Sequence, residues 1–126
     1  MTSNGQTVKQ AAASFLLAVR EQVALEGSYV ASRHLAVDCE GRKCQPCQPA
    51  AVRLSLHGAI GRVKGPGRYG LAEMGAIDAL YGALRAFRPS ERGLTYFAAR
   101  ADQRTAIALI DWAVAQLTGT ELAAAA

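Results

Sequence analysis

The sequence predicts a mainly α-helical fold, a compact bundle of about four helices with a small β-hairpin inserted between the first two. Apolar residues recur every three or four positions in four segments, as the buried face of a helix requires. Alanine is abundant and aromatic residues make up only 6% of the chain, which favours close packing of helices. The stretch between the first two periodic segments lacks this spacing and contains a Glu-Gly turn signal.

The composition is that of a folded protein. With 126 residues, 51% of them hydrophobic and 19% charged, the chain is long enough to close one core. We therefore expect a single helical domain over residues 1–126, with frayed tails at 1–6 and 119–126. No signal peptide or membrane-crossing run is visible, and an odd number of cysteines is typical of a reducing compartment. These features predict a cytoplasmic protein without a membrane partner, and they leave the oligomeric state open.

The first helix is predicted over residues 7–26, and Gly27 follows it as a stop signal. Its apolar face consists of Val8, Ala12, Phe15, Val19 and Val23. After the glycine, residues 35–39 and 42–44 have the composition of two short strands around the Glu-Gly turn. They predict the hairpin.

The second helix is predicted to begin at Pro49, because the fixed φ of proline suits a first helical turn. It ends at Gly65, and its apolar face is Val52, Leu56, Ile60 and Val63. A third helix is predicted over residues 71–87, and Pro89 closes it. Its apolar face is Met74, Ile77, Leu80, Tyr81, Leu84 and Phe87.

The last helix follows a connector, which is predicted over residues 90–100. Asp102 is a good N-cap, because its carboxylate can accept a bond from the free N–H groups of the first turn, and Gly119 ends the helix. Its apolar face is Ile107, Ile110, Val114 and Leu117. Trp112 lies off this stripe, so it either packs against the connector or marks a contact surface.

The middle of the chain is basic. Residues 41–72 contain no acidic residue, and the whole chain has a formal net charge of +4. The basic residues of this segment are Arg42, Lys43, Arg53, Arg62, Lys64 and Arg68. Such a charge favours an acidic partner, either a macromolecule (protein or nucleic acid) or an anionic nucleotide. A mildly basic protein without such a partner explains the charge equally well.

The sharpest motif is Cys39-x4-Cys44-x2-Cys47. A structural zinc ion needs four ligands in a tetrahedral array, and a Cys-x2-Cys pair closes one half of it without strain. The fourth ligand would be His57, or His34 just before the hairpin. The motif thus predicts one structural zinc ion. Because the second pair of a strong zinc signature is missing, free thiols are the alternative.

A glycine-rich loop, residues 61–70, is the second candidate site. Glycines let a backbone approach a phosphate closely, cations neutralise the phosphate, and an aromatic ring can stack on a base. The residues that would bind the anion or partner are Arg62, Lys64, Arg68 and Tyr69. The Gly-Lys-Ser/Thr ending of a Walker loop is absent and no predicted strand precedes the loop, so an ordinary turn between helices is the alternative.

Catalytic groups are not assembled by any spacing in the sequence. A cysteine of the motif with His57 and Asp111 would supply a nucleophile, a base and an orienting group, but nothing brings them together. Ser55 and His57 are two residues apart on a predicted helix, so they point to different faces. The sequence therefore predicts a protein that is not an enzyme.

Four short motifs follow one another along the chain: Asp38-x-x-Gly41-Arg42, Pro49-x-Ala51-Val52, Gly58-Ala59-Ile60 and Arg104-Thr105. In this order they resemble a small bacterial and phage family, the domain-of-unknown-function family 6197. The resemblance spans residues 15–117 and implies a fold and a bacterial or phage setting, without a mechanism. The chain departs from the family pattern in its three cysteines, and in an Arg-Ala-Asp stretch where Trp-Asn-Asp is common.

These observations predict a small non-enzymatic binding or regulatory protein, bacterial or phage, that acts on a macromolecular partner. One alternative is a zinc-stabilised nucleic-acid-binding module, whose basic residues between 42 and 68 contact phosphates. Another is a sponge for a phosphorylated nucleotide, captured by Arg62, Lys64 and Arg68. The salt dependence of binding distinguishes the regulatory binding protein from the nucleic-acid-binding module, because phosphate contacts weaken steeply as the salt concentration rises. A nucleotide ligand would raise the melting temperature.

Overall fold

The computed structural model describes residues 7–119. Its helices are α1 (Val8–Ala24), α2 (Leu56–Lys64), α3 (Leu71–Phe87), α4 (Leu94–Arg100) and α5 (Gln103–Thr118). Between α1 and α2 lie three short strands, β1 (Ala36–Val37), β2 (Lys43–Cys44) and β3 (Arg53–Leu54). The mainly helical fold with a strand insertion between the first two helices is confirmed. The described part of the chain has five helices rather than about four.

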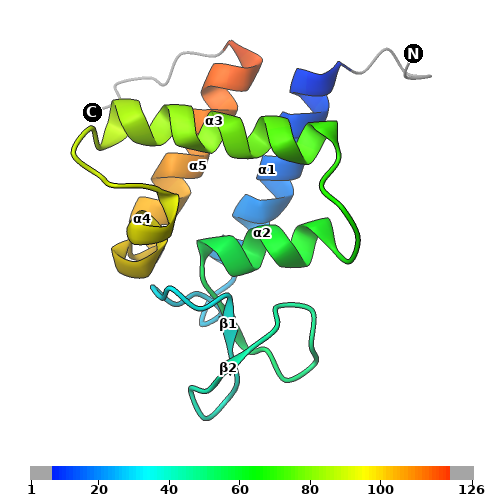
Figure 1. The fold of residues 1–126 in the computed structure, drawn as a ribbon, viewed down its shortest axis with the longest axis vertical. Coiled ribbons are helices and arrows are strands. Elements are labelled where there is room, and N and C mark those ends of the chain that lie inside the picture. The colour runs from blue at the N-terminus through cyan, green and yellow to red at the C-terminus, as the bar shows by residue number, and fades with distance from the viewer. Residues whose placement is uncertain (1–6, 120–126) are drawn as a thin grey trace.

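The core lies between the helices. Figure 1 shows α3 lying across α1 and α5, with α2 below it and the strands projecting beyond α2. Each helix contributes at least one large side chain to the core, among them Leu16, Leu56, Leu80, Phe97 and Leu109. Many of the remaining core residues are alanines, including Ala12, Ala76, Ala83, Ala106 and Ala113. Small side chains let helix axes approach closely, as the alanine-rich composition predicts.

Side-chain caps define the helix ends where the sequence predicts them. Thr7 Oγ1 accepts the Gln10 backbone N–H at 3.1 Å, and Gln10 Oε1 accepts the Thr7 N–H at 2.7 Å, which makes a capping box for α1. Asp102 Oδ1 accepts the Thr105 N–H at 2.8 Å at the start of α5. Gly119 ends α5 in the left-handed conformation, with φ of 72°. Of the tails predicted at 1–6 and 119–126, all residues but Gly119 lie outside the described region.

The predicted apolar face of α3 is partly wrong, although its bounds are as predicted. Met74 is 54% exposed and Tyr81 is 39% exposed, whereas Ala76 and Ala83 are fully buried. The helix contributes these alanines to the core together with Leu80 and Leu84, whereas Met74 and Tyr81 lie largely outside it. Val8 on α1 is likewise 52% exposed. The hydrophobicity of these side chains therefore led to a wrong prediction of their burial.

Two residues of α5 make contacts that the sequence did not predict. Trp112 is partly buried against the core, and its ring centre lies 5.9 Å from that of Phe87 at the end of α3. Its ring therefore packs beside the end of α3. Asp111 forms an ion pair with Arg20 of α1, with 2.6 Å between Oδ1 and Nε.

The second helix begins at Leu56, not at Pro49 as predicted. The buried Ser55 is its N-cap, because Ser55 Oγ accepts the Gly58 backbone N–H at 3.2 Å. A capping residue has an extended backbone, here with φ of −79° and ψ of 179°, so the helix cannot continue toward Pro49. The residues just before the cap form β3 instead.

The strands form an antiparallel sheet in the order β2-β1-β3, so the predicted hairpin is confirmed and gains a third strand. Ala36 pairs with Cys44 on one side and with Leu54 on the other, and these side chains share a face. With Ala51 they form a small second core. On the opposite face, Lys43 and Arg53 flank Val37.

The connector predicted over residues 90–100 contains α4. Its buried residues Leu94, Phe97 and Ala98 have helical spacing, but the helix is only 7 residues long. So short a segment does not present enough turns for its period to stand out in the sequence. This is the helix that the prediction missed.

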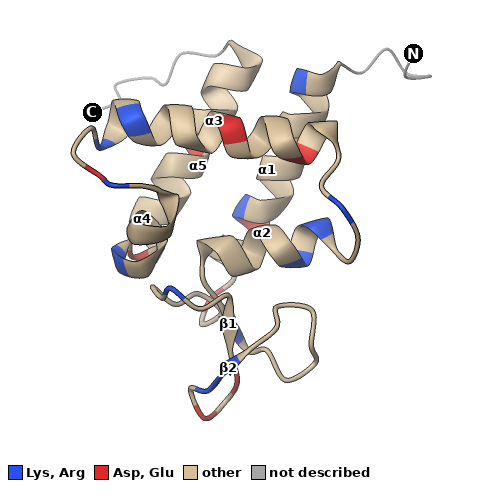
Figure 2. Cartoon of the chain, viewed as in Figure 1, with Lys and Arg blue, Asp and Glu red and all other residues tan. Residues whose placement is uncertain are grey.

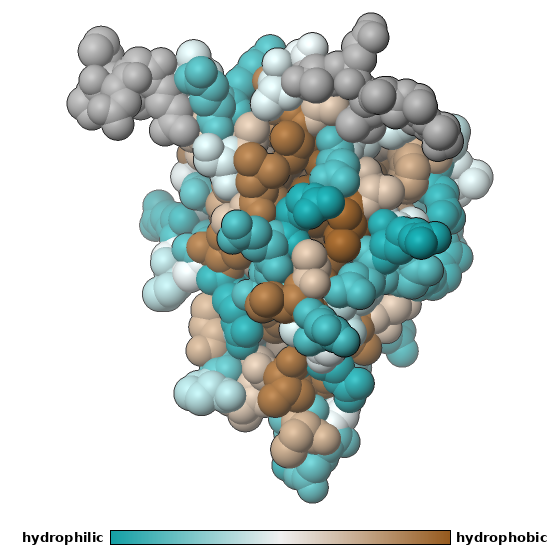
Figure 3. All heavy atoms as spheres, turned by 180° about the vertical axis from the view of Figure 1, so that it is seen from behind, coloured by the Kyte–Doolittle hydropathy of each residue, from teal (hydrophilic) through white to brown (hydrophobic). Residues whose placement is uncertain are grey.

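Apolar side chains at the surface of the described region are spread over several elements. Large ones that are exposed include Leu17, Leu25, Leu71, Met74 and Tyr96. In the rear view, apolar residues form a broken strip that hydrophilic residues cross (Figure 3). Scattered exposure of this kind is normal for a folded protein. No helix among residues 7–119 is long and apolar enough to cross a membrane.

Candidate anion-binding site

The four predicted zinc ligands lie on different parts of the fold. Cys39 is exposed in the hairpin turn, Cys44 is half-buried on β2, and Cys47 lies in the loop before β3, with its Sγ 3.9 Å from the carbonyl oxygen of Gly61. The fourth predicted ligand, His57, is on α2. Over residues 7–119, no group of three or more His, Cys, Asp or Glu side chains is arranged to hold a metal ion. The structure does not assemble the predicted site, and zinc binding stays a prediction.

His57 packs between helices. Its Nε2 lies 3.5 Å from Thr95 Oγ1 of α4, and the side chain is partly buried. Burial lowers the pKa of His57 below its ordinary value of 6.5, because a charged imidazole loses its hydration there. The neutral form is therefore the one that the fold favours.

This burial predicts a loss of stability in mild acid. The pKa of His57 is lower in the folded than in the unfolded state, so the unfolded chain binds the proton more readily as the pH falls through 6.5. We expect the free energy of unfolding, measured in urea, to be lower at about pH 5.5 than at about pH 7.5. His57→Gln should reduce this difference. A His57→Gln protein that keeps the full difference between the two pH values would contradict the assignment.

Two cations of the glycine-rich loop are engaged with the backbone of the protein itself. Arg62 donates from Nε to the carbonyl oxygen of Pro46 at 2.8 Å, and from Nη2 to that of Ala51 at 3.2 Å. Lys64 donates to two carbonyl oxygens of the turn after α2 and lies 4.8 Å from the centre of the Tyr69 ring. These contacts tie α2 to its neighbouring loops. An anion at either side chain would compete with them.

The structure brings only some of this predicted site together. Lys64 and Tyr69 are in contact, while Arg62 is directed at residues 46–51. Arg68 is exposed, and it forms no hydrogen bond or ion pair with any other described residue. Figure 2 shows more basic than acidic positions on α2, the turn after it and the sheet. Anion binding by the loop stays a prediction.

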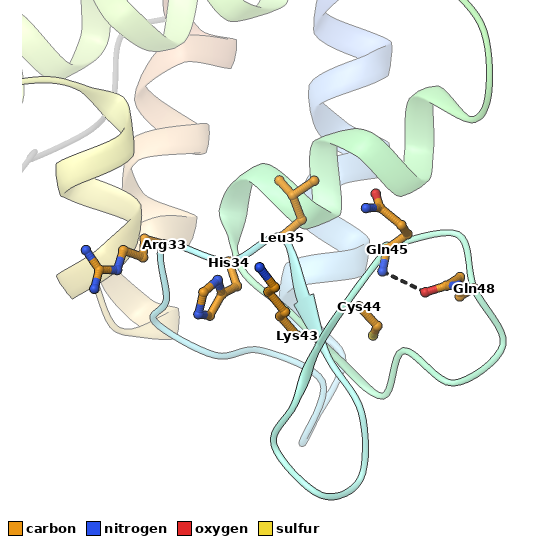
Figure 4. A pocket seen from close by; sticks show the side chains of 7 residues that line it. All are labelled: Arg33, His34, Leu35, Lys43, Cys44, Gln45 and Gln48. Carbon is orange, nitrogen blue, oxygen red and sulfur yellow. Dashed lines mark hydrogen bonds between the residues drawn. The ribbon is translucent and has the colours of Figure 1, made fainter.

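A different basic pocket lies beside the sheet, and the sequence analysis did not predict it. Its volume is about 390 Å³, and it is open to solvent on one side. Figure 4 shows its lining: Arg33, His34, Leu35, Lys43, Cys44, Gln45 and Gln48. None of these residues is acidic. Within the described chain, the side chains of Arg33 and Lys43 form no hydrogen bond and no ion pair.

Strand pairing creates this pocket. Because β1 and β2 are antiparallel and Ala36 pairs with Cys44, the segment that leads into β1 runs beside the residues that follow β2. This segment carries Arg33 and His34. The Ser32 N–H donates to the carbonyl oxygen of Ala98 at 3.1 Å, so this segment is also attached to α4. Residues that are separate in the sequence thus converge on one pocket.

Hydrogen bonds hold the walls of the pocket. Ser32 Oγ accepts the His34 N–H at 2.9 Å, which shapes the wall that carries Arg33. Across the pocket, Gln48 Oε1 accepts the Gln45 N–H at 2.8 Å and closes the loop after β2. In Figure 4, Arg33 extends toward α4, away from Gln45 and Gln48. The only sequence signal for this wall is the Arg-His pair before the first strand.

Fold and pocket together define a mainly α-helical protein with a small antiparallel sheet, whose edge strand lines an open basic pocket. Comparison with protein-family models, curated proteins and solved structures finds no match to this chain. The resemblance to family 6197 is thereby neither supported nor contradicted, and it stays a prediction.

Proposed function

We propose that this chain is a small non-enzymatic binding protein that holds an anionic group of a macromolecular partner in the pocket beside β2. The observation that supports this is that Arg33 and Lys43 line one pocket whose lining contains no carboxylate. Cations gathered without a counter-charge repel one another, and a bound anion relieves that repulsion. The resemblance to family 6197 suggests a bacterial or phage setting for this role.

The chemistry of the lining restricts the ligand. Arginine and lysine side chains have only hydrogen-bond donors, so a group bound between Arg33 and Lys43 must supply acceptors. The planar fork of arginine matches a phosphate or a carboxylate with two parallel bonds, and lysine adds a compact charge. The amides of Gln45 and Gln48 on the other wall can donate to further oxygens.

The proposal predicts a specific loss of polyanion binding. In the double variant Arg33→Gln/Lys43→Gln, binding of inorganic polyphosphate at about 100 mM salt is expected to weaken by about tenfold or more. The slope of log affinity against log salt should fall by about 2, one for each lost cation. Isothermal titration calorimetry at several salt concentrations measures both quantities.

A matched control separates the pocket from net charge. The double variant Lys9→Gln/Arg85→Gln removes the same charge from α1 and α3, which do not line the pocket. It should reduce polyphosphate affinity much less than the pocket variant. Equal losses in the two variants would mean that binding follows the net charge of the protein, and the pocket would not be the site.

A further inference from the structure

A second hollow adjoins the basic pocket. It has a volume of about 430 Å³ and is lined by Arg33, Thr95, Tyr96 and Ala99. Arg33 belongs to both linings, so the two hollows are neighbours across this one side chain. The lining of the second hollow contains no acidic residue.

The second hollow offers an aromatic surface. Tyr96 of α4 is 50% exposed, although the residue that follows it, Phe97, is buried in the core. The guanidinium carbon of Arg92 lies 4.8 Å from the centre of the Tyr96 ring. Because the guanidinium lies over one face of the ring, a planar ligand can stack on the other face of the ring or on the guanidinium itself.

The carboxylate that precedes Arg92 in the sequence does not oppose this charge. Glu91 precedes α4, but its side chain is only 5% exposed, and its Oε1 forms an ion pair with Arg100 at 2.5 Å. The cations of the two hollows therefore have no acidic counterpart in either lining. Arg33, His34, Lys43, Arg92 and Tyr96 are referred to below as the basic–aromatic surface.

We propose that the partner of this surface is single-stranded nucleic acid. The inference rests on the anion-binding role proposed above and identifies the ligand. A phosphate occupies the pocket between Arg33 and Lys43, and a neighbouring base stacks on Tyr96. Nucleic acid alternates phosphates with flat bases, as the surface alternates cations with an exposed ring. The strand is single because a base inside a duplex cannot reach a ring on a helix surface.

An acidic protein partner fits the surface less well. Carboxylates would satisfy Arg33 and Lys43, but a carboxylate gains nothing over the exposed Tyr96 ring, because the face of an aromatic ring is electrostatically negative. Nucleic acid satisfies both hollows with one repeating unit. The same argument favours no particular base, because every base has a face that can stack.

The test compares four polyanions in about 100 mM salt by fluorescence anisotropy: a labelled oligothymidine of about 12 nucleotides, a duplex of the same length, labelled polyphosphate and labelled polyglutamate. We expect the single strand to bind more tightly than the duplex. Tyr96→Leu should weaken single-strand binding by about 5- to 100-fold and should leave polyphosphate binding within about twofold. Arg92→Gln should weaken single-strand binding by a smaller factor.

Tyr81→Leu is the matched control, because it changes an exposed tyrosine on α3 that lines neither hollow. It should leave all four affinities unchanged. If Tyr96→Leu has no more effect than Tyr81→Leu, or if polyglutamate binds more tightly than the oligonucleotide, the nucleic-acid inference is overturned and the anion-binding function stands. If Arg33→Gln/Lys43→Gln changes neither oligonucleotide nor polyphosphate binding, both proposals fail.

Discussion

Replacing Gly58 with alanine is expected to lower the free energy of unfolding by at least about 3 kcal/mol. Gly58 is buried in the first turn of α2, and a Cβ built there would lie 1.7 Å from the carbonyl oxygen of Leu35. This oxygen also accepts the Ser55 backbone N–H at 3.1 Å. Because the obstacle is backbone and already hydrogen-bonded, no rotation of a side chain can make room.

Gly82→Ala provides the matched control. Gly82 is in the interior of α3, and the nearest heavy atom to a Cβ built there would lie at 3.8 Å, an ordinary contact. The same substitution there should raise the free energy of unfolding by about 0.5–1 kcal/mol, because alanine favours a helix over glycine. Urea titrations followed by circular dichroism compare the two variants. A Gly58→Ala protein as stable as Gly82→Ala would show that the contact with Leu35 yields easily.

The close approach at Gly58 also positions the candidate site. Leu35 lines the basic pocket and directly follows Arg33 and His34, so the contact between Gly58 and Leu35 sets that wall of the pocket against α2. A variant that separates them should bind polyphosphate more weakly even in its folded fraction. Stability and binding are therefore linked through one glycine.

Local chemistry made much of the helical fold predictable. The ends of α3 and α5 follow from glycine, proline and the carboxylate of Asp102, each of which acts within one helical turn. The start of α2 was not predictable in the same way. Pro49 and Ser55 are both good start signals, and the choice between them depends on β3 pairing with β1, a contact that is distant in the sequence.

The candidate site was less predictable for the same reason. Basic residues were visible in the sequence, but their partners were not. Arg62 carries a full charge and still uses its donors on the carbonyl oxygens of Pro46 and Ala51. Arg33 lies outside the basic segment, and it lines the same pocket as Lys43 only because two-residue strands pair. Charge can be counted from a sequence, whereas convergence depends on contacts between distant residues.

Phe97→Ala is expected to lower the free energy of unfolding by about 3–5 kcal/mol. Phe97 is 2% exposed and belongs to the main core, where it is among the largest buried side chains of the described region. It also anchors α4, whose 7 residues are too few to stay helical without tertiary contacts. Urea unfolding at neutral pH measures the change, and a loss of helical signal before the main transition would show α4 detaching first.

Tyr96→Ala is the control, since it truncates the adjacent, half-exposed ring. It should change stability by no more than about 0.5 kcal/mol. The contrast matters for function, because a ring can stack on a base at low entropic cost only if the helix that carries it is already fixed. If Phe97→Ala costs no more stability than Tyr96→Ala, then Phe97 does not anchor α4. The Tyr96 ring would in that case not be held in place beside the pocket, and the stacking contact would lose its structural basis.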